Sequence, residues 1–208
     1  MLASLKSDFY LLRGYFKTLL GVYAFMIVIS VIQGNAYMAN FYPAFLAIYM
    51  PYTLFSLSQQ SGWETMLLSA PVSRGGLVGG RYAMCLAVDG VMLLISFAVS
   101  CFIEPDAVLE NICSVLLTLT LVLALNAVLL PIIYKFGVNR ARFVFMAVCL
   151  VPALALPLSD AIDCLPLTNA FSRIIRSVPA LLGVCVCAFA LLGLSYWISY
   201  AIYHRKEF

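Results

Sequence analysis

The sequence predicts an all-α integral membrane protein with six transmembrane helices, and three observations lead to that class. Of 208 residues, 64% are hydrophobic and only 10% are charged, whereas soluble domains are about half apolar and a quarter charged. Six apolar runs approach or exceed the roughly twenty residues that cross a bilayer as a helix. The basic residues are concentrated beside alternate ends of these runs, as they are in short cytoplasmic loops.

Each apolar run is expected to be a helix, because a backbone inside a bilayer must satisfy its own hydrogen bonds. The fifth run is short and contains Pro152 and Pro157, which predict a kinked or broken helix. The six predicted spans are 16–33, 41–57, 81–103, 112–134, 143–158 and 178–203.

The charged residues predict the orientation of these spans, because basic short loops stay in the cytoplasm. With both termini cytoplasmic, the opposite side receives Glu104, Asp106 and Glu110, and only Arg173 and Arg176 of the basic residues. We therefore expect a multi-pass protein of a plasma membrane, in a prokaryote. The basic residues on the cytoplasmic side are Lys6, Arg13, Lys17, Arg74, Arg81, Lys135, Arg140, Arg142, Arg205 and Lys206.

An amphipathic helix over 1–16 is predicted to lie along the membrane surface before the first span. Its apolar residues recur every three or four positions and share one face, whereas the basic ones fall elsewhere. A cytoplasmic extension of the first span is the alternative, and Gly14 leaves room for a bend. Interspersed charges and the lack of a small-residue cleavage site argue against a cleavable signal peptide. The residues that define this helix are Lys6, Phe9, Leu12, Arg13 and Phe16, with Leu2 and Leu5.

The segment SGWETMLLSAPVSR, residues 61–74, is the least membrane-like part of the chain. Ser61 and Glu64 have capping-box spacing, which predicts the start of a short helix. Pro71 predicts its end, because proline cannot continue the hydrogen-bond ladder. Such a helix carries Trp63 beside an acid and several apolar residues. It either anchors at the headgroup level through Trp63 or docks another protein.

Several stretches of this sequence resemble the small six-span permeases of the type-2 class of ABC transporters, along essentially the whole chain. They are LKSDFYLLRGYF, the pair Trp63-Glu64, the run LLSAPVSR and the pair Arg81-Tyr82. The resemblance implies an interfacial N-terminal helix and a coupling helix at 61–71 that inserts into a separate ABC ATPase subunit. It also implies a second permease subunit, identical or homologous, across the translocation path. The implied coupling residues are Trp63, Glu64, Met66, Leu67, Leu68, Pro71 and Arg74.

Four glycines after Arg74 depart from the charged, helix-favouring stretch that such permeases often carry there. Gly75, Gly76, Gly79 and Gly80 each cost a helix interior about 1 kcal/mol relative to alanine. They predict a looser link into the third span and leave its start open. Their small-xxx-small spacing would also permit close contact between helices.

The sequence contains no nucleotide or catalytic motif. The glycine-rich GGLVGGR lacks the lysine and the Ser or Thr of a P-loop, so ATP and magnesium are expected in the partner ATPase. The seven cysteines lie mostly in apolar runs and His204 in a basic tail, so neither a metal site nor an enzyme is predicted. Scattered basic residues give no reason to expect a nucleic-acid partner.

Among the polar residues of the predicted spans, Asp89 in the third and Asn126 in the fourth are the candidates for a pathway or interhelical role. An ionisable group inside a span is a functional hypothesis by default. Asp89 is expected about two turns from the cytoplasmic boundary, so a structural pairing with a neighbouring helix or a contact with cytoplasmic water suits it as well as substrate binding does. Asn126 suits an interhelical hydrogen bond.

Residues 159–177 are too polar to span the membrane and are expected at the outer interface. The resemblance implies a re-entrant helical hairpin there. Arg173 and Arg176, one turn apart, would share a face near outer headgroups or an exiting anionic group.

Two functions follow from these features. The first is an ABC exporter permease, and its sparsely charged spans favour a hydrophobic or amphipathic cargo such as a lipid-like molecule or a membrane-active peptide. The second is a membrane scaffold or a membrane enzyme that acts without ATP. The lack of a polar catalytic cluster disfavours an enzyme, and the segment 61–71 favours an ATPase partner.

Overall fold

The computed structural model describes residues 2–34, 36–60, 74–138, 140 and 178–205. In these ranges every regular element is an α-helix, so the predicted all-α class is confirmed. The helices are α1 (Leu2–Gln33), α2 (Ala36–Gln60), α4 (Arg74–Ile103), α5 (Val108–Phe136) and α9 (Val178–Arg205).

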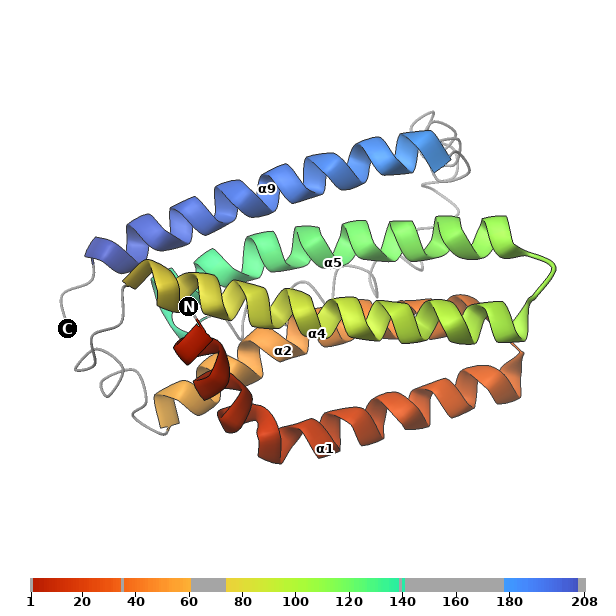
Figure 1. Ribbon diagram of the computed structural model, residues 1–208, viewed down its shortest axis with the longest axis horizontal. Coiled ribbons are helices and arrows are strands. Elements are labelled where there is room, and N and C mark those ends of the chain that lie inside the picture. Colours follow the sequence, from red (N-terminus) through yellow and green to blue (C-terminus); the bar gives the residue numbers. More distant parts are fainter. Residues whose placement is uncertain (1, 35, 61–73, 139, 141–177, 206–208) are drawn as a thin grey trace.

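The helices form an elongated bundle (Figure 1). At one end, on the left in Figure 1, α1 and α4 begin and α2, α5 and α9 end. We call this the basal end. At the other end, the distal end, short turns join α1 to α2 at Gly34 and α4 to α5 across Glu104–Ala107. The termini of the described chain therefore share the basal end.

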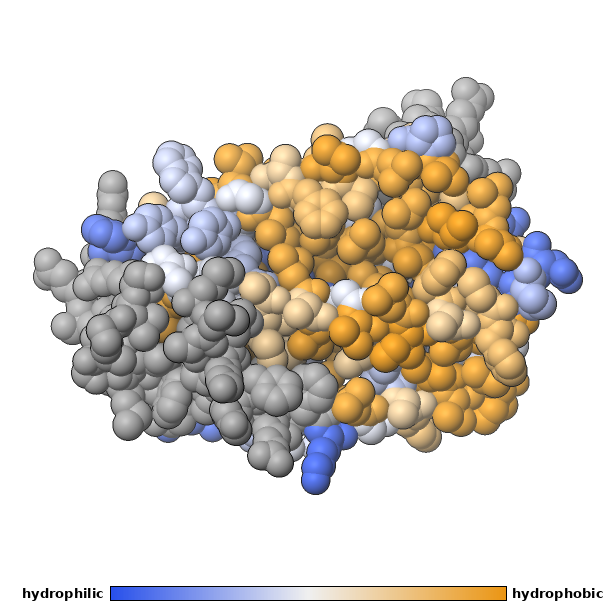
Figure 2. All heavy atoms as spheres, in the orientation of Figure 1, coloured by the Kyte–Doolittle hydropathy of each residue, from blue (hydrophilic) through white to orange (hydrophobic). Residues whose placement is uncertain are grey.

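Among the described residues, three helices are long and apolar enough to cross a membrane: Gly75–Ile103, Val108–Phe136 and Val178–His204. They correspond to the predicted third, fourth and sixth spans. In α1 the apolar part Lys17–Gln33 is shorter, and α2 covers the predicted second span. The predicted fifth span and the segments 61–71 and 159–177 lie outside the described residues. Apolar residues cover the middle of the face in Figure 2, as expected of helices that face lipid.

The start of α4 corrects the expectation of a loose glycine-rich link. The helix begins at Arg74 and continues through all four glycines. Packing explains this, because a Cβ added at Gly75 would lie 3.2 Å from the ring of Tyr200 in α9. Leu77 and Val78 of the same turns are buried. Tertiary contact thus outweighs the low helix propensity of glycine.

The N-terminal part of the chain belongs to the same helix as the first span. α1 runs from Leu2 to Gln33 as one helix and changes direction within its N-terminal part (Figure 1). The interfacial position of residues 1–16 stays a prediction, since the side chains before Gly14 are not described.

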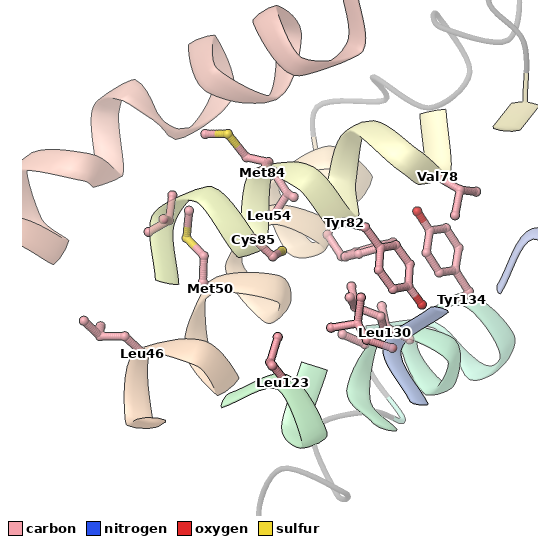
Figure 3. Close-up of a cluster of buried hydrophobic side chains, with 14 of the residues drawn as sticks. Leu46, Met50, Leu54, Val78, Tyr82, Met84, Cys85, Leu123, Leu130 and Tyr134 are labelled. Carbon is pink, nitrogen blue, oxygen red and sulfur yellow. The ribbon is translucent and has the colours of Figure 1, made fainter. Parts of the chain in front are cut away.

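The centre of the fold is α4, which contacts α1, α2, α5 and α9. Its buried side chains Val78, Cys85 and Met92 belong to one apolar cluster with residues of the other helices. Figure 3 shows part of this cluster, with Leu46 and Met50 at one side and Val78 and Tyr134 at the other. Polar residues interrupt this core at three levels along the bundle.

Candidate functional site

A group of aromatic and polar side chains joins four helices at the basal end. It lies beside the end of α2 and the start of α4, the two helices that flank residues 61–73. We call it the basal cluster, and its members are Phe55, Ser58, Arg81, Tyr82, Tyr134, Ser195, Tyr196, Ser199 and Tyr203.

Arg81 is the charged member of this cluster and is fully buried. Its Nη2 donates a hydrogen bond to Ser58 Oγ at 2.7 Å. Its guanidinium carbon lies 4.3 Å from the ring centroid of Phe55, which is cation–π geometry. Burying a guanidinium is costly unless it is hydrogen-bonded. These two contacts supply part of that compensation and fasten α4 to the last turns of α2.

Tyr82, the next residue, joins α4 to α9. Its hydroxyl lies 2.8 Å from both Ser195 Oγ and Ser199 Oγ, which are four residues apart and share one face of α9. Its ring also meets Tyr196 edge to face, with centroids 5.6 Å apart. α4 therefore binds α2 through Arg81 and α9 through Tyr82.

Tyr134 joins α5 to the same cluster. Its ring packs edge to face against Phe55 of α2, with centroids 4.8 Å apart, and against Tyr203 of α9 at 5.7 Å. α5 ends just beyond, where Gly137 adopts a φ of 80° and donates its N–H to Ile133 O. Glycine adopts this left-handed conformation without the strain that a side chain would add.

The first turn of α4 is also held by α9. The Tyr196 hydroxyl donates to the carbonyl oxygen of Gly75 at 3.4 Å, and the ring of Tyr200 leaves little room for a side chain at that position. The helix that follows residues 61–73 is thus in contact with another helix from its second residue.

The second polar level lies in the middle of the bundle and consists of Asp89 and Asn126. Asn126 Nδ2 donates to Asp89 Oδ2 at 2.7 Å and to Val122 O at 3.1 Å. Asp89 is 2% exposed and Asn126 is fully buried. The structure thus brings together the two intramembrane polar residues that the sequence singled out.

The third level is a distal network of hydroxyl and amide groups on α1, α2, α4 and α5. Asn40 Nδ2 donates to Ser114 Oγ at 2.7 Å, and Ser100 Oγ donates to Asn40 Oδ1 at 3.1 Å. The Tyr23 hydroxyl donates to Met92 O at 2.7 Å. Ser96 and Asn111 complete the network through the carbonyl oxygens of Ala39 and Glu104, respectively.

The other predicted site residues are placed as follows. Arg74 is the first residue of α4, and Lys6, Phe9, Leu12, Arg13 and Phe16 lie in α1. The side chains of all six are outside the description. The remaining coupling residues and the pair Arg173 and Arg176 lie outside the described residues altogether.

Sequence reasoning missed the basal cluster. The sequence places Arg81 at the start of a span and, with Tyr82, within the resemblance to type-2 permeases, whereas the structure buries its side chain between α2 and α4. One usable signal was the pair Ser195 and Ser199, which places two hydroxyls on one face of an apolar helix. In the described residues, no group of three His, Cys, Asp or Glu side chains is arranged to hold a metal ion.

A helical bundle with several membrane-length apolar helices defines a multi-pass membrane protein. A family model described as ABC-2 family transporter protein matches residues 5–204. The chain therefore belongs to the ABC-2 transporter family and is a permease subunit of an ABC transporter. The family implies partnership with an ABC ATPase and a transport role rather than a catalytic one. No curated relative matches the chain.

Proposed function

We propose that this permease subunit belongs to an ATP-driven exporter that moves a hydrophobic or amphipathic cargo outward, and that residues 61–71 form its contact with the ATPase. The observation that carries the proposal is the attachment of the two helices that flank this segment. α2 ends at Gln60 and α4 begins at Arg74, and Arg81 binds Ser58 and Phe55 between them. A displacement of the segment is therefore delivered to both helices together.

The basal cluster passes such a displacement on to the rest of the bundle. Tyr82 connects α4 to α9, and Tyr134 connects α2 to α5 and α9. Aromatic rings and a guanidinium are stiff groups with few rotatable bonds at their contacting ends, which suits them to transmit movement between helices. The distal turns, where consecutive helices are tied closely, serve as the pivot.

The charges support a cytoplasmic basal end. Backbone positions of Arg74, Arg81, Lys135, Arg140 and Arg205 lie toward the basal end, whereas Glu104, Asp106 and Glu110 lie at the distal turn and the start of α5. By the positive-inside rule, the ATPase docks at the basal end and the termini are cytoplasmic. ATP and magnesium bind in that partner, and a second permease subunit, identical or homologous, completes the path.

The surface between α4 and α5 supports an apolar cargo or a close contact with lipid. A groove of about 450 Å³ lies between these helices. It is lined by apolar residues, Gly90, Leu93 and Phe97 of α4 and Ile112, Val115 and Leu119 of α5 among them. Acyl chains and apolar peptide side chains bury against such a surface without leaving polar groups unpaired.

The experiment that tests the coupling role uses the permease reconstituted with its ATPase. The double variant Trp63→Ala/Glu64→Ala is expected to abolish cargo-stimulated ATP hydrolysis and ATPase retention while the permease stays inserted, because truncating central aromatic and charged residues of an interface costs about 2 kcal/mol or more each. Stimulated hydrolysis and retention at the wild-type level would show that the segment is only a membrane anchor.

Two conservative changes refine the same test. A headgroup-level anchor tolerates Trp63→Phe and Glu64→Gln, whereas a docking interface loses contact area and a charge. We expect both variants to reduce stimulated hydrolysis measurably. If both are silent while the double alanine variant is inactive, the segment matters through its insertion into the membrane rather than through docking.

The basal cluster has its own test. Ser58→Ala removes the acceptor of Arg81 Nη2 and is expected to lower stimulated hydrolysis about tenfold, since hydrogen bonds to charged groups contribute about 1.5–3 kcal/mol. Ser56→Ala is the matched control, because Ser56 lies on the same helix and, among the described residues, its hydroxyl accepts only a 3.4 Å bond from Gln60. Equal activities of the two variants would show that the hydrogen bond between Arg81 and Ser58 does not contribute to coupling.

A further inference from the structure

The middle of the bundle buries a carboxyl group against an amide. Asp89 lies near the middle of α4, with Val88 and Met92 buried beside it along the helix. Asn126 lies on α5, with Val122 and Leu123 buried one turn before it. The pair therefore sits in apolar surroundings at membrane depth, where a polar group must find its partners within the protein.

The hydrogen bonds of this pair are incomplete in a specific way. Asn126 Nδ2 donates to Asp89 Oδ2 and to Val122 O, so both amide protons are in use. Asp89 Oδ1 and Asn126 Oδ1 are buried and have no hydrogen-bond partner in the part of the chain that the structure describes. Both are acceptors. Two acceptor atoms of the pair are therefore left without a donor among the described residues.

Within the described helices no side chain donates a hydrogen bond to these two oxygens. The other buried ionisable groups of these helices are Tyr23 in α1; Arg81, Tyr82 and Cys85 in α4; Tyr134 in α5; Cys185 and Tyr203 in α9. Tyr23 is bonded to Met92 O and Ser96, and Arg81 to Ser58. In sequence, the predicted span 143–158 contains no hydroxyl, amide or basic side chain.

We propose that Asp89 and Asn126 form a proton-binding site, in which the bound proton makes a neutral carboxylic acid–amide pair. The proton sits on Asp89 Oδ1 and is donated to Asn126 Oδ1, while Asn126 Nδ2 donates to Asp89 Oδ2. The reaction is the uptake of one proton from water by the carboxylate, and no other bond changes. A single proton thereby satisfies both unpartnered oxygens and removes the charge from an apolar interior.

A metal cation fits these residues less well than a proton does. Hard cations take about six or more oxygen ligands, and the pair has two free oxygens. A protonated pair also joins α4 to α5 by two hydrogen bonds, whereas an ionised pair has a single bond between the two side chains and, among the described residues, two unpaired oxygens. The site therefore links the occupancy of one proton to the contact between two central helices.

Infrared spectroscopy of the wild-type protein in lipid tests the site directly. We expect a carbonyl stretch of a protonated carboxylic acid at neutral pH, which moves to lower frequency on labelling with ¹³C-carboxyl aspartate and again in heavy water. Failure to detect a labelled acid band in the wild type would overturn the proposal, whatever the variants do.

Two variants assign the band. Asp89→Asn is expected to abolish it and Asn126→Ala to move it to higher frequency, because the Asp89 carbonyl loses its hydrogen bond from Nδ2. Glu110→Gln is the matched control, an exposed carboxyl at the start of α5, and should leave the labelled acid band in place. A loss of carboxylate bands in Asp89→Asn would show that Asp89 is ionised.

The same spectra distinguish a bound cation from a proton. A carboxylate signal from Asp89, together with a thermal midpoint that rises with sodium chloride but not with choline chloride and only when Asp89 is present, would replace the proton by a cation. We expect equal midpoints in the two salts at equal ionic strength. Neither outcome depends on the ATPase, so the proton site and the coupling role stand or fall separately.

Discussion

The two ends of the bundle use polar residues in different ways. The distal network consists of hydroxyl and amide groups, several of which bond to backbone carbonyls such as Ala39 O and Glu104 O. The basal cluster surrounds one guanidinium with aromatic rings and serine hydroxyls, and its contacts run mainly from side chain to side chain. Both join four helices, yet only one of them contains a buried charge.

The difference indicates which end is fixed and which can adjust. At the distal end, short turns join α1 to α2 and α4 to α5. The backbone therefore sets the register within each of these two pairs. Basal helices are joined through residues 61–73 or through long intervals of sequence, and a side-chain contact can change with a rotamer. A permease driven from its basal end would need this division, with a pivot at one end and movable contacts at the other.

The largest expected effect is the opposite accessibility of the two ends. A cysteine at Asp106 should react only with reagent added outside and a cysteine at Ser61 only with reagent added from the cytoplasm, in a chain freed of its native cysteines. The measurement is labelling with a membrane-impermeant maleimide in intact cells and again in permeabilised cells. The reverse pattern would mean that the bundle has the opposite orientation in the membrane, with the basal cluster on the outside.

The next effect concerns the start of α4. Gly75→Leu is expected to destabilise the protein by about 1–3 kcal/mol, because even a Cβ there lies 3.2 Å from the Tyr200 ring and overpacking forces neighbours to shift. Gly90→Leu on the same helix is the control, since a Cβ there meets nothing within 4 Å. Its thermal midpoint should hold or rise, because leucine favours helix over glycine by about 1 kcal/mol. Similar losses in both variants would contradict a tight contact specific to the basal end.

The start of α4 also marks the limit of what the sequence could predict. The spans followed from apolar length alone, which is why 81–103, 112–134 and 178–203 lie inside α4, α5 and α9. The helical conformation of the first turns of α4 could not be predicted from apolar length, because Gly75 is held by Tyr196, which lies 121 positions further along the chain. Propensity is a local quantity, and this contact is not local.

The same reasoning applies to the polar residues. Asp89 and Asn126 stood out because each is conspicuous in an apolar run, and they proved to be partners. The burial of Arg81 could not be predicted, because a basic residue at a span boundary normally faces water. Its burial depends on Ser58 and Phe55, which are provided by a different helix. A pairing across helices cannot be deduced from the composition of one of them.

A smaller effect is expected in the distal network. Asn40→Ala removes a bond to Ser114 Oγ and one from Ser100 Oγ, and each interhelical bond in a membrane protein contributes about 0.6 kcal/mol and at most about 1.7. A loss of about 1–2 kcal/mol is therefore expected in reversible unfolding. Thr53→Ala on the same helix is the control, since in the part of the chain that the structure describes its hydroxyl bonds only to Tyr49 O within α2. If the two changes cost the same, the distal end is not held by its network.

The smallest expected effect tests whether the basal cluster is adjustable. Tyr82→Phe keeps the ring against Tyr196 and removes the hydroxyl between Ser195 and Ser199. Each serine can then turn its hydroxyl to a backbone carbonyl four residues earlier on α9, as serines in helices do. The expected cost is therefore well under 1 kcal/mol, less than for Asn40→Ala, which removes the whole amide together with both of its interhelical bonds. Thermal unfolding of the two variants side by side makes the comparison, and a larger loss for Tyr82→Phe would mean that the basal end, not the distal one, is the rigid end of the bundle.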